Sequence, residues 1–308
     1  MRSAEAGLAH QNSLTAQRHG IAFAVATALL FSFSDALIKQ LVLMAPFVFV
    51  LWLRYLFQLS LMSAWLLARG GSAPQAGHWR LHLLRCSLLA VSSVSGYLAL
   101  RHVPLAEYTA LMMLAPVVSV VLGRVVLKEH VSAQQWMCVL LGALGMLAVL
   151  RPGLSAWTAQ ALLPVASAFA YAAFQMTSRK LMAVADIVIS NLISAAFIVG
   201  VAGLALVVWP LDWPEVRRQL GVLWWAKFSL MCLIATGGQL SLTAALQKSS
   251  LSVAAPFAYL QILFAAVIGL VFFDHWPDRT TLLGTALIAV AGIGSALLNG
   301  RTPVPLRR

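Results

Sequence analysis

Long apolar runs separated by short polar or charged segments dominate the pattern of this 308-residue chain. A helix needs about 20 apolar residues to cross the hydrocarbon core of a membrane. Charged residues, glycines and prolines divide the chain into ten runs of about this length. The pattern predicts an all-α polytopic membrane protein with ten transmembrane helices, over residues 20–43, 46–68, 80–100, 104–127, 133–150, 158–180, 187–209, 221–246, 250–273 and 280–298.

The composition excludes the soluble classes of protein. Hydrophobic residues make up 61% of the chain and charged residues only 10%, and the mean hydropathy is +0.88. A soluble domain carries about 25% charged residues, so soluble enzymes and nucleic-acid binders are excluded. We therefore expect the formal charge of +12 to set the orientation in the membrane and to contact anionic headgroups at the cytoplasmic face. No nucleic-acid partner is expected.

The distribution of Lys and Arg predicts the orientation. The connections between the runs are short, so positively charged ones are expected in the cytoplasm. The side that carries the N-terminus has 13 of the 21 Lys and Arg residues, Arg80 and Arg85 among them. The opposite side has 7, and Arg54 lies within a run. We therefore expect a multi-pass protein of the inner (plasma) membrane with both termini in the cytoplasm.

The two halves of the chain show an internal repeat. A shift of 146 residues aligns the fourth and fifth runs with the ninth and tenth, and a shift of 140 lays residues 31–39 over 171–179. An odd number of helices per half inverts the second half, an arrangement that places a substrate site near the membrane midplane. The predicted organisation is a cytoplasmic segment at 1–19, repeats of five helices at 20–152 and 153–298, and a basic cytoplasmic tail at 299–308.

Several short motifs carry a family resemblance. They are Phe31-Ser-x-Ser-Asp35-Ala-x-x-Lys39, Leu53-Arg54-Tyr55, Lys128-Glu129 with Gln135-Trp136 and Gly142, Ala170-Tyr171 with Arg179-Lys180-Leu181, Ala254-Ala255-Pro256-Phe257-x-Tyr259-x-Gln261, and Trp276-Pro277-Asp278-x-x-Thr281-x-x-Gly284. Over about residues 20–298 the chain resembles the drug/metabolite transporter superfamily, in its ten-span EamA-type family. The last two motifs are similar to those of S-adenosylmethionine and riboflavin carriers and bacterial metabolite exporters. The resemblance implies a secondary transporter and leaves the substrate open.

Ionisable residues within the runs are the first candidates for a site, because charge at membrane depth is costly. Asp35 is a candidate for a substrate amine or a coupling proton, or a partner of Lys39 four residues later on the same helix face. Arg54 is a candidate for a substrate carboxylate, or a structural clamp. Glu107 is either a site residue or an interfacial carboxylate.

Uncharged polar residues and helix-bending residues extend the set. Candidates for the lining of the site are Gln58, Tyr97, Gln175, Asn191, Gln239, Tyr259 and Gln261, although amides also hold membrane helices together and tyrosines also pack in the core. Candidates for structural or gating roles are Lys39, Pro116, Glu129, Pro256, Gly237 and Gly238.

The leading functional hypothesis is a secondary active exporter of a small amphiphilic or zwitterionic metabolite, such as an amino acid or an opine-type metallophore. The alternative is an uptake carrier for S-adenosylmethionine or riboflavin. A membrane-embedded enzyme is a remote alternative, since the nine acidic residues are scattered, and a channel would show a continuous polar stripe. No metal or cofactor is expected, because His78 and His82 lack acidic or thiol neighbours.

Overall fold

The structure is a computed structural model in which residues 2–68, 78–127, 132–150, 159–182, 185–208, 211–248, 259–274 and 276–299 are described. These residues form helices and connections, and the described part of the chain contains no strand. The helices are α1 (Arg2–Met44), α2 (Phe47–Ala68), α3 (Trp79–His102), α4 (Leu105–Met112), α5 (Ala115–Leu127), α6 (Ala133–Leu150), the 3-10 helix η1 (Ala159–Leu162), α7 (Leu163–Met182), α8 (Ile187–Val208), α9 (Trp213–Gln219), α10 (Val222–Lys248), α12 (Leu260–Phe273) and α13 (Arg279–Asn299).

Besides the short helix α9, which forms in the expected connection after residue 209, the structure differs from the sequence expectation in two places. The expected fourth helix is interrupted between α4 and α5, because proline has no backbone N–H and Pro116 is accommodated only in a first helical turn. The polar segment before the first apolar run is helical, and α1 begins at Arg2. This segment is rich in Ala, Leu and Gln, which favour helix, and it contains no proline.

Four described helical segments are long and apolar enough to cross a membrane: His19–Met44, Phe47–Ala68, Trp79–His102 and Val188–Val208. Shorter apolar segments occupy Trp136–Val149, Leu260–Phe273 and Arg279–Gly294. Large apolar side chains are exposed along these helices, among them Leu67, Leu204 and Val290. An apolar surface of this extent requires a lipid environment, so the protein is an integral membrane protein.

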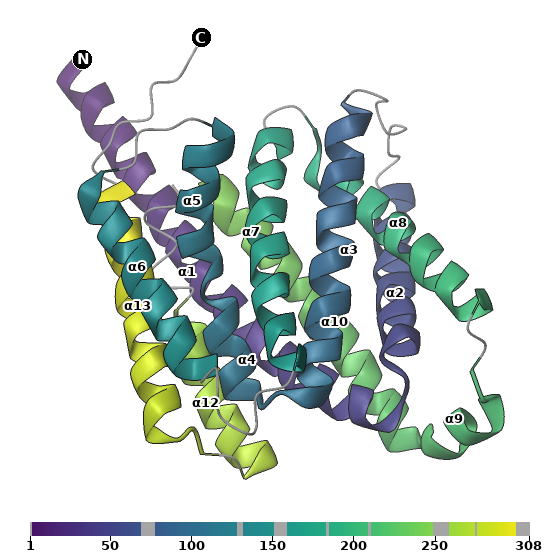
Figure 1. Ribbon diagram of the computed structural model, residues 1–308. Coiled ribbons are helices and arrows are strands. Elements are labelled where there is room, and N and C mark those ends of the chain that lie inside the picture. The colour runs from purple at the N-terminus through teal and green to yellow at the C-terminus, as the bar shows by residue number, and fades with distance from the viewer. Residues whose placement is uncertain are drawn as a thin grey trace.

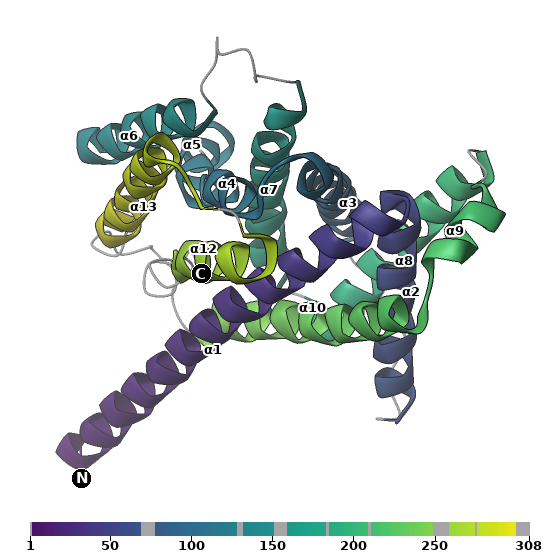
Figure 2. The same ribbon diagram turned by 90° about the horizontal axis from the view of Figure 1, so that it is seen from below.

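The helices pair along their lengths across the two halves of the chain. Helix α1 lies along α10, α3 along α7, α2 along α8, and α6 along α13, as Figures 1 and 2 show. Helix α1 also contacts α12, and α7 contacts α4 and α5. If each helix of the first predicted repeat is replaced by its counterpart in the second, and the reverse, the same set of pairs results.

Glycines let these paired helices approach closely. A Cβ at Gly238 of α10 would lie 2.7 Å from the ring of Phe31 in α1. A Cβ at Gly96 of α3 would lie 3.3 Å from the hydroxyl of Ser167 in α7. Helices α6 and α13 meet backbone to backbone, since a Cβ at Gly145 would lie 2.7 Å from the carbonyl oxygen of Gly284. These contacts join helices from the two halves of the chain.

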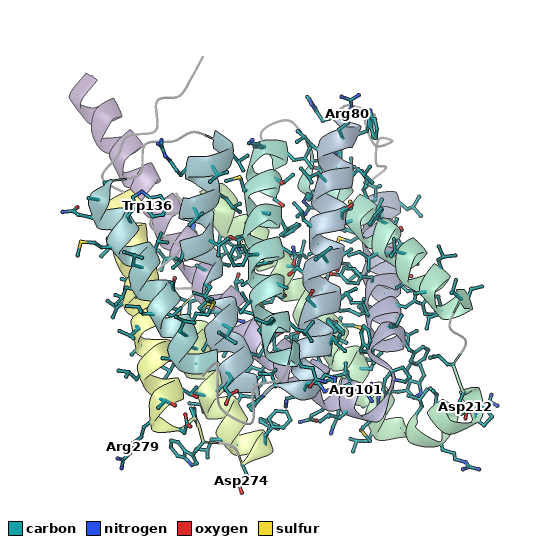
Figure 3. The ribbon with its side chains drawn as sticks, viewed as in Figure 1. Arg80, Arg101, Trp136, Asp212, Asp274 and Arg279 are labelled. Atoms are coloured by element: carbon teal, nitrogen blue, oxygen red, sulfur yellow. The ribbon has the colours of Figure 1, made fainter. Side chains whose placement is uncertain are left out.

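The helix ends define two opposite faces. Arg80, at the start of α3, and Trp136, near the start of α6, lie at one end of the bundle in Figure 3. The opposite end carries residues from the other ends of several helices, which are Arg101, Asp212, Asp274 and Arg279. Helix α3, which carries both Arg80 and Arg101, therefore runs most of the way between the two faces.

Candidate functional site

Asp35 lies on α1 where that helix crosses α12. Its carboxylate accepts a hydrogen bond of 3.3 Å from Nε2 of Gln261 in α12. One turn earlier, the hydroxyl of Ser32 donates to the main-chain oxygen of Gln261 at 3.0 Å. Asp35 keeps part of its surface exposed, and no residue that the structure describes forms an ion pair with it. The sequence predicted both Asp35 and Gln261 as site residues, and the structure brings them together.

Arg54 is the cation that faces Asp35 from α2. It acts electrostatically on Asp35, but the two charges are too far apart for an ion pair. Its guanidinium carbon lies 4.5 Å from the centre of the Tyr55 ring. The Nε of Arg54 is buried without a hydrogen-bond partner. A guanidinium and a carboxylate that form no ion pair with each other therefore lie near each other inside the bundle.

Tyrosines from three further helices surround this pair of charges. Tyr97 of α3, Tyr108 of α4 and Tyr171 of α7 all interact electrostatically with Asp35. The hydroxyl of Tyr97 is buried without a partner. We call the group formed by Asp35, Arg54, Tyr97, Tyr108, Tyr171 and Gln261 the central site. Gln175, the predicted counterpart of Asp35 in the second repeat, lies against the hydroxyl of Tyr171.

Lys39 does not pair with Asp35, although the spacing of four residues allows it. Its Nζ donates to the main-chain oxygens of Leu100 and Val103, at 3.1 and 2.6 Å. These carbonyls belong to the C-terminal end of α3, where unpaired acceptors and the helix dipole attract a cation. Glu107 interacts electrostatically with Lys39 and so lies toward this end of the bundle.

Asn191 belongs to a second buried polar group, which is centred on Arg85 of α3. Arg85 is 5% exposed, and its Nη2 donates to Oδ1 of Asn191 in α8 at 2.8 Å. Its Nε donates to the hydroxyl of Ser178 in α7 at 2.9 Å. From the sequence, Arg85 was counted with the cations on the side of the N-terminus, and this buried group was not predicted.

The remaining predicted residues lie elsewhere. Gln58 is buried on α2, and Gln239 lies on α10 two residues after Gly237. The hydroxyl of Tyr259 donates to the main-chain oxygen of Met113 at 3.4 Å. Glu129 and Pro256 lie outside the described residues.

Tyr108 of the central site and Tyr55, which lies beside it, were not among the sequence candidates. Tyr55 directly follows Arg54, and its hydroxyl forms a 2.7 Å hydrogen bond with that of Ser93. Tyr108 directly follows Glu107. In both cases the tyrosine is the direct neighbour of a charged residue that was chosen as a site candidate.

An all-helical membrane protein with a charged, tyrosine-lined site between its helices has the architecture of a membrane transporter. The sequence profile of the EamA-like transporter family matches the chain twice, over residues 18–151 and 158–297. The chain therefore belongs to the EamA-like transporter family, within the drug/metabolite transporters. Among the described residues, no group of three His, Cys, Asp or Glu side chains is placed to hold a metal ion.

Curated relatives of the chain are transporters rather than enzymes. The pseudopaline exporter CntI of Pseudomonas aeruginosa is 26% identical, over 90% of this chain and 95% of its own length. An S-adenosylmethionine uptake transporter of Rickettsia bellii is 22% identical, over 79% of this chain and 81% of its own. A riboflavin transporter of Brucella anthropi is 28% identical over 44% of this chain and 48% of its own. One solved structure superposes with a TM-score of 0.64 at 18% identity, covering 93% of this chain and 97% of that chain.

Proposed function

We propose that the protein is a secondary active transporter that exports a small zwitterionic metabolite derived from an amino acid. The observation that carries this proposal is the pair formed by Asp35 and Arg54, two opposite charges that interact electrostatically without forming an ion pair. A substrate with an ammonium and a carboxylate group can satisfy both at once. Asp35 would bind the ammonium group and Arg54 the carboxylate, for which a guanidinium is well suited.

The proposed architecture is ten transmembrane helices in two inverted repeats, at residues 20–152 and 153–298. The exchange symmetry of the helix pairs supports it, because α1 packs on α10 as its repeat counterpart α7 packs on α3. The central site takes residues from both repeats, including Asp35 and Gln261. Rocking of one repeat against the other would then expose the site to each face in turn.

The proposed location is the inner membrane, with both termini in the cytoplasm. The excess of Lys and Arg on the side of the N-terminus supports this orientation. In the same orientation Arg80 faces the cytoplasm, whereas Arg101 and Arg279 face outward (Figure 3). Anionic headgroups would contact the cytoplasmic cations.

Export of an amino-acid-derived product is supported by the likeness to the pseudopaline exporter, which covers 90% of this chain. Uptake of S-adenosylmethionine is the second candidate. That compound also carries an ammonium and a carboxylate group, and the Rickettsia bellii transporter covers 79% of this chain. Riboflavin carries neither charge and would leave Asp35 and Arg54 without partners, so it fits the central site less well.

The test begins with mass spectrometry of cells and medium from deletion and overexpressing strains. An exported compound accumulates inside the deletion strain and outside the overexpressing strain. A nutrient that the deletion strain leaves in the medium would instead establish uptake. The compound identified is then measured in proteoliposomes that contain the wild-type protein.

Two variants test the role of the central site in the same proteoliposomes. Asp35→Asn and Arg54→Gln are expected to reduce flux at least tenfold, the effect of losing a charged contact of about 1.4 kcal/mol or more. Asp186→Asn and Arg80→Gln are the matched controls, because both residues are exposed and Asn is as good a helix N-cap as Asp. Wild-type flux in both site variants would refute the assignment.

A further inference from the structure

We propose that Arg85, Asn191 and Ser190 form a second binding site for the substrate carboxylate, on the Arg80 side of the central site. This inference rests on the proposed function, because it gives the transported zwitterion a second place to bind along its route. Arg85 lies six residues after the start of α3 at Trp79, or about 9 Å along the helix axis. Arg85 is 5% exposed, so the site is inside the bundle.

The charge of Arg85 has no counter-charge among the described residues. Its four hydrogen bonds go to neutral oxygens, which are the hydroxyls of Ser178 and Ser194, the main-chain oxygen of Ser190 and the amide oxygen of Asn191. Asp186 directly precedes α8, which carries Ser190 and Asn191. Its carboxylate accepts hydrogen bonds from the N–H groups of Val188 and Ile189. A guanidinium cannot lose its proton in a protein, so a buried positive charge remains.

Unpartnered polar atoms gather around this cation. Seven buried side-chain nitrogen or oxygen atoms of the described residues have no hydrogen-bond partner. Two of them, Arg54 Nε and Tyr97 OH, belong to the central site. Three more are Asn191 Nδ2, Ser190 Oγ and Nδ1 of His82, which interacts electrostatically with Arg85. Asn191 is 2% exposed and Ser190 3%.

These unpartnered groups suit an oxyanion. Buried polar groups are rarely left without a partner, and the Asn191 amide and the Ser190 hydroxyl can both donate. The Oδ1 of Asn191 is held by Arg85, which leaves the NH2 group of the same amide free to donate. A carboxylate would accept these donors and neutralise the guanidinium at the same time.

Aromatic contacts connect this site to the central one. The guanidinium carbon of Arg85 lies 4.8 Å from the centre of the Phe174 ring. Phe174 stacks on Tyr171, with ring centres 5.8 Å apart, and Tyr171 interacts electrostatically with Asp35. Tyr55 interacts electrostatically with both Arg54 and Arg85. Arg54 and Arg85 therefore lie beside the same group of aromatic side chains, as expected for successive binding positions of one anionic group.

The test measures binding rather than flux, so its failure is distinguishable from failure of the proposed function. The purified full-length protein in detergent is titrated with sodium malonate at constant ionic strength, and thermal unfolding is followed. Arg54→Gln serves as the background, because it removes the other cation. We expect its melting temperature to rise by about 3 °C at ten times Kd, and the Arg54→Gln, Arg85→Gln double variant to show no rise.

Asn191→Asp keeps the test decisive if the double variant does not fold. The new carboxylate would lie against Arg85 and occupy the site, so the Arg54→Gln, Asn191→Asp protein should lose the response to malonate. The control is Arg80→Gln in the same background, which removes an exposed cation of α3 and should keep the response. Malonate stabilisation that survives Asn191→Asp or Arg85→Gln, or that is absent from Arg54→Gln, would overturn the proposal. Stabilisation by added phosphatidylglycerol but not by malonate would assign the site to a lipid phosphate and overturn it as well.

Discussion

The hydroxyl of Tyr259 contacts the main chain of Met113, and the predicted internal repeat makes these two positions equivalent. They are 146 residues apart, the same shift that aligns the fourth and fifth runs with the ninth and tenth. Met113 lies in the interruption between α4 and α5, and Tyr259 directly precedes α12. The hydroxyl of Tyr259 donates to the carbonyl oxygen that the interruption leaves available. Interrupted helices are common where transporters bind their substrates.

This contact depends on the absence of a side chain at Gly292 of α13. A Cβ at that position would overlap the hydroxyl of Tyr259. We expect Gly292→Ala to displace Tyr259, break the bond to Met113 and lower the free energy of unfolding by about 1–3 kcal/mol. Thermal unfolding in detergent measures the change. The control is Gly200→Ala on α8, where a Cβ meets nothing within 4 Å; equal melting temperatures for the two variants would contradict the prediction.

The separation of Asp35 from Lys39 gives a second prediction. Lys39→Gln should cost about 1.5–3 kcal/mol, because a charged donor to the carbonyls of Leu100 and Val103 is lost. Asp35→Asn should cost little, since Asn also accepts the hydrogen bond from Gln261. A double-mutant cycle on thermal unfolding should therefore give a coupling energy within about 0.5 kcal/mol. A larger coupling would mean that the two charges pair after all.

The sequence predicted the main charged residues of the central site because charge is rare in its apolar runs. Asp35 and Arg54 had to face the protein interior, and the structure places both there. Gln261 was recognisable as a polar residue in an apolar run. Pro116 indicated a bend in the fourth run, and the structure has an interruption just before it.

The partners of these residues were less predictable. Helical spacing puts Asp35 and Lys39 on one face, but it contains no information about the end of α3, whose carbonyls hold Lys39. Arg85 was grouped with Arg80 because it stands near the start of a run. Its position inside the apolar run at 80–100 was the available signal that Arg85 faces inward, and its neighbours at helical spacing, Leu89 and Ser92, are buried with it.

The proposed chemistry of Asp35 predicts a pH dependence of transport. Protonation of the carboxylate removes the negative charge that would hold a substrate ammonium group. A proton arriving from the outer face should therefore promote release there, and an acidic exterior should stimulate export. Flux into an acidified medium from proteoliposomes of defined orientation measures this effect. Asp35→Asn should transport at a rate independent of pH, and a wild-type pH profile in that variant would exclude Asp35 as the proton carrier.

The adjacent glycines Gly237 and Gly238 of α10 should respond differently to the same substitution. A Cβ at Gly238 would lie 2.7 Å from the Phe31 ring of α1, whereas a Cβ at Gly237 would lie 3.8 Å from Leu30, an ordinary contact. Gly238→Ala should therefore push α10 away from α1 and lower the free energy of unfolding by about 1–3 kcal/mol. Gly237→Ala should raise it by about 0.4–1 kcal/mol, because alanine restricts the unfolded chain. Since α1 carries Asp35, we also expect Gly238→Ala to reduce flux while Gly237→Ala leaves it near the wild-type rate; the reverse order would mean that α1 and α10 do not pack as the structure places them.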